Sequence, residues 1–456
     1  MGDFIETPFH EIRPPGLTRC EDGGVGNINY RWEARVHPKR QGIRVGMQRF
    51  KVCVGFAVIF GLAAFHLNAA PADVWQPQLT TKPPLSVFLR TISEFAADIF
   101  WRGAEKMGSP PRLTPIEHPE YFIQVNDEER AAYVAQAQLW QPTDIAKLTP
   151  DSVKAGEKTS LHNDAEIRCD YVPRTTDQLG GTTPKFECRG SDGHVYRVKY
   201  GKPKAFTSVA ASRLFWALGY GADITTPVKI RCHGCSSDPW TKPQKVDTDA
   251  YFPNAIVQQL QPGKEITLRG QAEVGWSWQL DLPLVSEEMG GATKAEVDGL
   301  VLLAAMIQHG DSKSSQQKLI CRDEESDAGT DSCSRPYMYI HDLGNTFGSD
   351  GVRTHPLDFE RWAAKRVWKD SRTCIADIRQ NFGNGGDGLQ YPKISEAGRA
   401  FLAGLLSQLI ANRANVVAIF EAAHMEEADG RHSAQAWADV LIEKAQQVIN
   451  HPRCPD

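Results

Sequence analysis

The sequence predicts an α+β fold in two parts, a strand-rich part followed by a helical part. Residues 165–262 contain short runs of alternating apolar side chains separated by turn residues, a pattern typical of β-strands. Residues 263–456 contain longer apolar patterns at helical spacing, which favour helices. We therefore expect a small β-rich lobe over 165–262, a helical lobe over 263–456, and a helical N-terminal extension with a linker over 73–164.

The predicted strands span Glu166–Val172, Lys185–Cys188, His194–Tyr200, Val228–Cys232 and Ala255–Leu260. The predicted helices span Val87–Met107, Asp127–Leu139, Ala205–Leu218, Phe359–Trp368, Glu396–Leu409, Arg413–Ala423 and Ala434–Ile449. One more helix is predicted to run to Gln308 from the capping box that Thr293 and Glu296 form.

The composition is that of an ordinary globular protein and excludes no enzyme class. Hydrophobic residues make up 41% and charged residues 23% of the 456 positions, which is close to average usage. The formal net charge of -5 gives no reason to expect a nucleic-acid partner, because such proteins favour a basic surface.

An apolar run near the N-terminus predicts export. Val52–Leu67 follows two basic residues and precedes a stretch of small residues, the order of a secretory signal. The run is shorter than the roughly 20 residues of a stable membrane span. We expect 47–72 to be a signal peptide or an uncleaved anchor, which would be the only membrane contact. Residues 1–46 are then a wrongly extended start or a cytoplasmic tail, and the protein is periplasmic or secreted.

Cysteine usage agrees with export. Eight cysteines follow the apolar run, and an even number in an oxidising compartment favours disulfides whose pairing the sequence leaves open. Cys321 and Cys333 flank a short acidic insertion and could staple it. Cys232 and Cys235 form a C-x-x-C that could be a redox pair or half a zinc site, although we favour a small structural disulfide.

Two polar segments in the helical part carry the residue types of a phosphoryl-transfer site. In His309–Gln316, an Asp is followed by a Lys two positions later and an amide five positions later. In Ile340–Gly344, a second Asp follows an apolar run. A phosphotransferase needs one Asp to accept the proton of the attacking hydroxyl and a Lys to balance the charge on the phosphoryl group that is transferred. It also needs oxygen ligands for metal. Asp311, Lys313, Gln316 and Asp342 have those types in that order.

The strand-rich part supplies partners for this site. A glycine-rich loop contains Gly180, Gly181 and Thr182, and such a loop lets backbone N–H groups approach phosphate oxygens. Lys199 follows at the end of a strand, where a kinase places the lysine that contacts phosphates. The elements follow one another as in a protein-kinase-like fold. Their order is a strand, the glycine loop, a strand with the lysine, a helix, further strands, a buried helix and the aspartate pair.

Two segments carry a family resemblance over roughly residues 165–425. Gly181–Phe186 is similar to the G-x-x-P-K phosphate loop of HipA-type kinases. Asp342–Gly348 resembles the metal-binding D-N-G-x-G-F-G segment of the secretory-pathway casein kinases and the related spore-coat kinases. The resemblance implies a two-lobed atypical kinase with ATP and Mg²⁺ or Mn²⁺ between its lobes.

The resemblance also implies a role for each candidate residue. It implies that Asp311 is the catalytic base, that Lys313 steadies the transferring phosphoryl group, and that Asp342 and Gln316 bind metal. It implies that Lys185 and Lys199 contact phosphates, together with the loop of Gly180, Gly181 and Thr182. Gln258 to Leu260 would form the hinge beside the adenine. The expected reaction is transfer of the ATP γ-phosphate to a hydroxyl of a protein or small molecule.

Two departures keep other functions open. The helix after Lys199 carries no Glu to hold that lysine, since Thr207 and Ser208 stand near the expected place. Gln316 is a neutral ligand where divalent cations prefer charged oxygen donors. A pseudokinase that binds nucleotide or a partner, an AMP transferase, and thiol redox chemistry at Cys232 and Cys235 are the alternatives.

Other polar residues have less specific readings. His309 and His341 flank the two aspartates and could bind metal together, although we favour histidines that support the core. The acidic run 324–327 is either a solvated loop or a selector of basic substrates. Trp276 and Trp278 are expected to pack in the core or on the surface.

Overall fold

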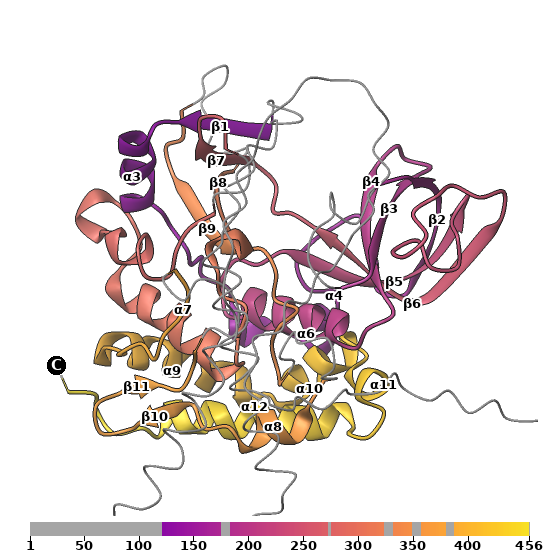
Figure 1. Cartoon of the computed structure of the whole chain (residues 1–456). Coiled ribbons are helices and arrows are strands. Elements are labelled where there is room, and N and C mark those ends of the chain that lie inside the picture. The colour runs from indigo at the N-terminus through magenta and orange to yellow at the C-terminus, as the bar shows by residue number, and fades with distance from the viewer. Residues whose placement is uncertain are drawn as a thin grey trace, which may run out of the picture. The chain divides into compact units, whose positions relative to one another are not determined.

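The computed structural model describes residues 121–174, 183–271, 275–322, 332–348, 357–379 and 387–455. All of them belong to one unit, Pro84–Asp456, with a mixed α+β architecture (Figure 1). The predicted signal segment 47–72, the predicted helix Val87–Met107, the glycine loop of Gly180, Gly181 and Thr182, and the acidic run 324–327 lie outside the described residues.

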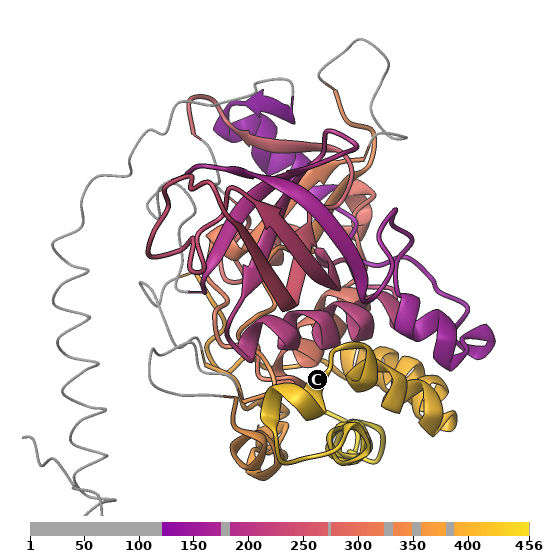
Figure 2. The same cartoon turned by 90° about the vertical axis from the view of Figure 1, so that its right-hand side faces the viewer.

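The alternating segments of the strand-rich part close into a five-stranded barrel with the order β2-β3-β4-β6-β5 (Figures 1 and 2). Neighbours are antiparallel except β2 and β5, whose parallel pairing closes the barrel. The strands are β2 (Ala165–Val172), β3 (Lys185–Gly190), β4 (Val195–Tyr200), β5 (Ile224–His233) and β6 (Asp249–Gln259). The five predicted strands are confirmed, and β5 and β6 are longer than predicted.

Aromatic side chains fill the interior of the barrel. Phe186, Tyr200 and Phe252 are buried and in mutual ring contact, with centroids 4.9 to 5.6 Å apart. The disulfide Cys169–Cys188 joins β2 to β3. The barrel therefore has a core of its own, which fixes the position of the lysines on β3 and β4.

Helix α6 (Lys204–Ala217) follows the barrel strand β4 and packs against both β5 and α10. Nearly every one of its side chains is buried, as expected for a helix that is apolar on all sides. Because α6 contacts both the barrel and the helical part, it connects the two.

A four-stranded sheet interrupts the part of the chain that we predicted to be helical. Its order is β1-β7-β8-β9, formed by β1 (Phe122–Val125), β7 (Lys264–Leu268), β8 (Gln317–Cys321) and β9 (Pro336–Ile340). The prediction missed these strands because β8 and β9 are buried along their whole length and show no alternation. Strand β1 comes from the predicted helical extension and pairs in parallel with β7.

Four helices of the C-terminal part agree with the predicted ranges: α7 (Lys294–Met306), α9 (Glu396–Ala411), α10 (Arg413–Ala422) and α12 (Ala434–Ile449). The short α11 (Met425–Asp429) was not predicted. The remaining helices are α3 (Asp127–Ala135), α4 (Pro150–Ala155) and α8 (Phe359–Ala364), with 3-10 turns at Ile145–Lys147, Leu282–Leu284, Glu287–Met289 and Ser314–Gln316. The predicted capping box of α7 is present, because Thr293 and Glu296 exchange backbone and side-chain hydrogen bonds.

The predicted helix Phe359–Trp368 is wrong in its second half. Helix α8 ends at Ala364, and β10 (Trp368–Asp370) pairs with β11 (Ile375–Ala376) in a two-stranded ribbon. Gln447 of α12 accepts hydrogen bonds from the backbone of Val367 and the indole of Trp368. Tertiary contacts therefore override the local helical pattern.

Four disulfides use the eight cysteines of the described residues: Cys169–Cys188, Cys232–Cys235, Cys321–Cys333 and Cys374–Cys454. The predicted staple between Cys321 and Cys333 and the structural disulfide of the C-x-x-C are thus present. Trp276 and Trp278 are buried in the main core.

No single helix of the described residues is both long and apolar enough to cross a membrane. Helices α9 and α10 together meet the length and composition, with a bend of 89° between them.

Candidate functional site

An ion pair between the barrel and the four-stranded sheet marks the centre of the candidate site. Lys199 lies on β4, and its Nζ is 3.3 Å from Oδ2 of Asp342, which follows β9. The other carboxylate oxygen of Asp342 accepts a hydrogen bond of 2.9 Å from the Gly344 backbone N–H. The Lys199 side chain is 4% exposed and that of Asp342 is 30% exposed. The two residues predicted to contact phosphate and metal therefore meet, and Asp342 is partly exposed there.

A second lysine lies beside the first. Lys185 on β3 is directly opposite Lys199 in the antiparallel register, and both are buried. Burial lowers the pKa of Lys185 to about 7, and Lys199 adds to this effect while Asp342 opposes it. Two close lysines with one aspartate form a positively charged site that suits phosphate oxygens.

The lysines also act on the aspartate. Burial raises the pKa of Asp342, but Lys199, Lys185 and the Gly344 N–H together outweigh burial and hold this pKa well below its ordinary value. Lys204, at the start of α6, lies in the same electrostatic environment, and its pKa is lowered, mainly by burial. Asp342 is therefore ionised at neutral pH, as a metal ligand must be.

The loop after α7 supplies the second group of residues. Asp311 Oδ2 accepts hydrogen bonds from Lys313 Nζ at 3.4 Å and from Gln316 Nε2 at 3.3 Å. Burial raises the pKa of Asp311, Lys313 opposes this effect and Asp342 adds to it. A carboxylate with a raised pKa accepts a proton more readily, which suits a general base.

Backbone hydrogen bonds join the two motif segments. The carbonyl of Gln316 accepts from the backbone N–H groups of His341, at 2.9 Å, and of Asp342, at 3.4 Å. The carbonyl of Asn345 accepts from the backbone N–H of Gly310 at 3.0 Å. The structure thus brings Asp311, Lys313, Gln316 and Asp342 together.

The residues predicted to form the hinge differ in burial and in their contacts. The buried side chain of Gln258 donates hydrogen bonds to Asp223 and, at 2.8 Å, to the carbonyl of His341. The ring of His341 is 2.9 Å from Asp223. Leu260 is 54% exposed. The Gln258 side chain therefore supports the segment of Asp342.

Helix α6 contacts the Asp342 segment through a hydroxyl instead of an acid. Thr207 Oγ1 lies 2.7 Å from two carbonyl oxygens, those of Gly344 and Lys204. Ser208 Oγ is buried and makes no hydrogen bond. The expected absence of a Glu on this helix is real, and Asp342 is the acid that Lys199 contacts in its place.

Two segments brace the Asp311 loop, and the sequence did not indicate them. The Asp387 carboxylate accepts a hydrogen bond of 2.9 Å from the Ser314 backbone N–H. The Ser312 hydroxyl accepts one of 3.0 Å from the Leu389 backbone N–H. The carbonyl of Asp387 in turn accepts from Ser277 and Trp278. Asp387 lies far from Asp311 along the chain, and no sequence pattern signals its role.

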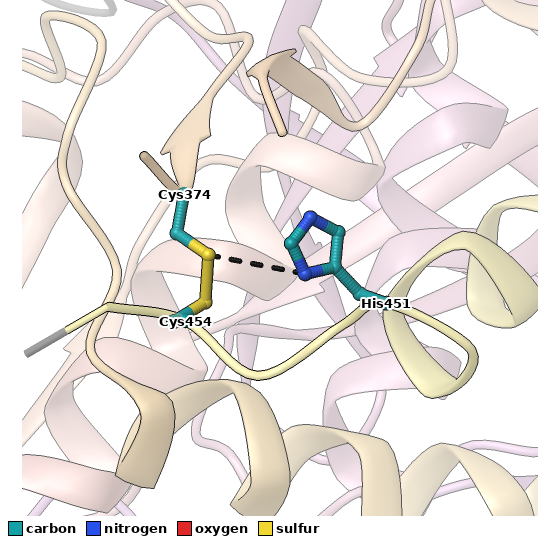
Figure 3. Close-up of side chains that lie close together, drawn as sticks. All are labelled: Cys374, His451 and Cys454. Atoms are coloured by element: carbon teal, nitrogen blue, oxygen red, sulfur yellow. Dashed lines mark hydrogen bonds between the residues drawn. A yellow bond between two sulfur atoms is a disulfide. The ribbon is translucent and has the colours of Figure 1, made fainter. Parts of the chain in front are cut away.

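The histidines do not form a metal site among the residues that the structure describes. His309 is fully buried and its ring nitrogens make no hydrogen bond, and burial lowers its pKa to about 4. His341 contacts Asp223 instead. The one group of close potential ligands in the described ranges is Cys374, His451 and Cys454, and Figure 3 shows its two sulfur atoms joined in a disulfide.

Oxygen donors at the candidate site fit a hard divalent cation. Asp342, Asp311 and the amide of Gln316 offer oxygen atoms, which Mg²⁺ and Mn²⁺ prefer. Oδ1 of Asp311 is buried and makes no hydrogen bond, and Lys313 Nζ lies 3.3 Å from it.

Neither a protein-family model nor a curated protein matches the chain. Among solved structures, the chain is similar to the proinflammatory kinase CtkA of Helicobacter pylori, with 10% sequence identity and a TM-score of 0.34. The match covers 63% of this chain and 94% of that one. A likeness this low carries no argument about function.

Proposed function

We propose that this protein is a kinase-like phosphotransferase that transfers the γ-phosphate of ATP to a hydroxyl group. The supporting observation is the meeting of Lys185 and Lys199 from the barrel with Asp342 and Asp311 from the other part of the chain. In the proposed layout the barrel with α6 is one lobe and the rest of the described chain is the other. ATP lies between them beside the two lysines.

The proposed transfer is a single displacement. The acceptor hydroxyl oxygen bonds to the γ-phosphorus while the bond from that phosphorus to the β–γ bridging oxygen breaks, and ADP leaves. Asp311 orients the hydroxyl and takes its proton, as its raised pKa allows. Lys185 and Lys199 bind the phosphates, and Lys313 balances charge on the moving group. Mg²⁺ or Mn²⁺ held by Asp342 and Gln316 would supply charge neutralisation at the phosphates.

Nucleotide binding without transfer is the second candidate. The absence of an acid on α6 and the neutral Gln316 favour it. AMP transfer on the same fold is a third, and the mass added to the acceptor separates it from phosphate transfer. We also propose that the protein is exported, because four disulfides are compatible with an oxidising compartment.

The decisive experiment is thermal unfolding of the full chain with ATP and Mn²⁺ or Mg²⁺. At a nucleotide concentration about 100-fold above Kd, we expect the Tm to rise by about 3–4 °C. Asp342→Ala should abolish this rise. The control is Asp439→Ala, which removes an acid that is 61% exposed and paired with Arg413, and it should keep the rise.

The result also decides between the candidates. No rise with either metal in the wild type would refute the phosphotransferase and the nucleotide-binding pseudokinase, and would leave a partner-binding scaffold. A rise without modified product, detected by mass spectrometry of acceptor mixtures, would favour the pseudokinase.

A further inference from the structure

A small cavity lies next to the Asp311 loop. None of the residues assigned to the proposed transfer lines it. Its volume is about 220 Å³, below the roughly 300–1,000 Å³ of typical ligand pockets. Its walls include the backbone of Gly310, which directly precedes Asp311, and of Gly348. The cavity is therefore too small for a nucleotide and large enough for one phosphate or one acidic side chain.

Basic side chains outnumber acids in the described lining of the cavity. Lys365, Arg379 and Arg361 line it, and the one acid among the described lining residues is Asp377. Lys365 Nζ lies 2.9 Å from Asp377 Oδ2, so this acid partly neutralises Lys365. The Arg379 side chain is exposed and has no ion pair within the described ranges. A guanidinium group in this setting can bind carboxylate or phosphate oxygens in a bidentate manner.

The walls of the cavity are fixed before any ligand binds. Gln308 has a φ of 57° and its side-chain amide donates to the carbonyls of Ala305 and Asp377, both at 2.9 Å. The indole of Trp362 is fully buried and donates to the carbonyl of Met306. Both contacts join the end of α7 to the opposite wall, so little order has to be created on binding.

We propose that this cavity binds an anionic group, a carboxylate or a phosphate, which the acceptor carries beside its reacting hydroxyl. The assignment of the ligand to the acceptor rests on the proposed function, because the cavity wall at Gly310 adjoins the proposed base Asp311. The binding of an anion depends only on the side chains that line the cavity. An acceptor recognised in this way is an acidic or phosphorylated molecule.

The test measures anion binding to the full chain by isothermal titration calorimetry at constant ionic strength. The probes are inorganic phosphate and glutarate, which distinguish phosphate from carboxylate recognition. Arg379→Gln should weaken binding of the preferred probe by about fivefold or more, since hydrogen bonds to charged groups contribute strongly. Asp377→Asn should tighten binding by about threefold, because it removes the opposing charge.

Two controls locate the binding. Arg372→Gln removes a cation that is 92% exposed on the nearby ribbon and lies outside the cavity lining, and it should leave affinity unchanged. Lys199→Gln tests the competing lysine-rich site. Loss of anion binding in Lys199→Gln, with wild-type affinity in Arg379→Gln, would overturn the proposal, and so would weaker binding in Asp377→Asn.

The outcomes separate this inference from the proposed function. The wild-type Tm rise with nucleotide reports on the lysine site, whereas the Arg379 and Asp377 variants report on the cavity. A nucleotide effect without anion binding at the cavity would retain the phosphotransferase and refute the cavity. Anion binding that depends on Arg379, without a nucleotide effect, would retain the cavity as an anion site and refute the phosphotransferase.

Discussion

At the scale of single residues, the unusual feature is the placement of Lys185 and Lys199 opposite each other in the barrel wall. Both are buried, and Asp342 is close enough to influence both. Like charges at opposed positions of a sheet are destabilising. The protein tolerates them here, which suits a site whose intended ligand is strongly negative.

This arrangement predicts a pH dependence of stability. The folded protein holds the pKa of Lys185 at about 7, against an ordinary value of 10.5. Between these values the unfolded chain binds a proton that the folded chain has lost, so the free energy of unfolding rises with pH by up to about 1.4 kcal/mol per pH unit. Lys185→Met should flatten that rise.

Urea denaturation at about pH 7, 8 and 9 measures this slope. The neighbours that influence Lys185 are Lys199, Arg197 and Lys204, which lower its pKa, and Asp342, which raises it. Arg189→Met is the control, because it removes an exposed cation elsewhere on β3. Equal slopes for wild type and Lys185→Met would show that Lys185 is already protonated in the folded protein.

At the scale of elements, the Asp311 loop depends on helices and turns on either side of it. Helix α7 delivers the chain to the loop, and Asp387 holds it by a hydrogen bond to the Ser314 N–H. The helices with clear caps, α7 among them, could be predicted from the sequence. The strands β8 and β9 could not, because uninterrupted apolar runs fit a buried helix and a buried strand equally well.

We predict that Asp387 positions the Asp311 loop. Asp387→Ala should leave the Ser314 N–H without its acceptor, cost about 1–2 kcal/mol, and speed hydrogen exchange of the amides between Asp311 and Gln316. Asp387→Asn keeps an oxygen acceptor and should have a smaller effect on both. Unchanged exchange in Asp387→Ala would mean that the loop is held by its other contacts.

The cap of α7 gives a second prediction at this scale. Thr293→Ala should lower the free energy of unfolding by about 1 kcal/mol, because the Glu296 backbone N–H loses its side-chain acceptor. Thr293→Ser keeps the hydroxyl and should be close to wild type. Chemical denaturation measures both variants, and equal losses in the two would attribute the effect to the methyl group instead of the cap.

At the scale of the whole molecule, the disulfides close loops of very different length. Cys374–Cys454 closes a separation of 80 residues and Cys321–Cys333 one of 12 residues. Chain entropy predicts that the free energy of unfolding falls by about 4–5 kcal/mol when the cysteines of the first disulfide are replaced by serines, and by about 3 kcal/mol for the second. Chemical denaturation of the two double variants measures which one loses more stability. A larger loss for the variant without Cys321–Cys333 would contradict an entropic origin of the stabilisation.

The sequence predicted those residues of the candidate site whose type, spacing or place in the order of elements carried a signal. Asp311, Lys313 and Gln316 lie within six positions, Asp342 follows an apolar strand, and the order of elements indicated Lys199. Thr207 and Asp387 belong to the site through tertiary packing. No periodicity or spacing encodes such contacts, because they depend on how distant elements meet.

Strand β1 pairs in parallel with β7 across more than a hundred intervening residues, and those residues include the entire barrel. Closing so long a loop costs entropy before the new contacts repay it, and contacts of this range slow folding. We therefore expect the four-stranded sheet to gain its outer strand β1 late in folding. Until then, the edge of β7 has unpaired backbone groups that could pair with another chain.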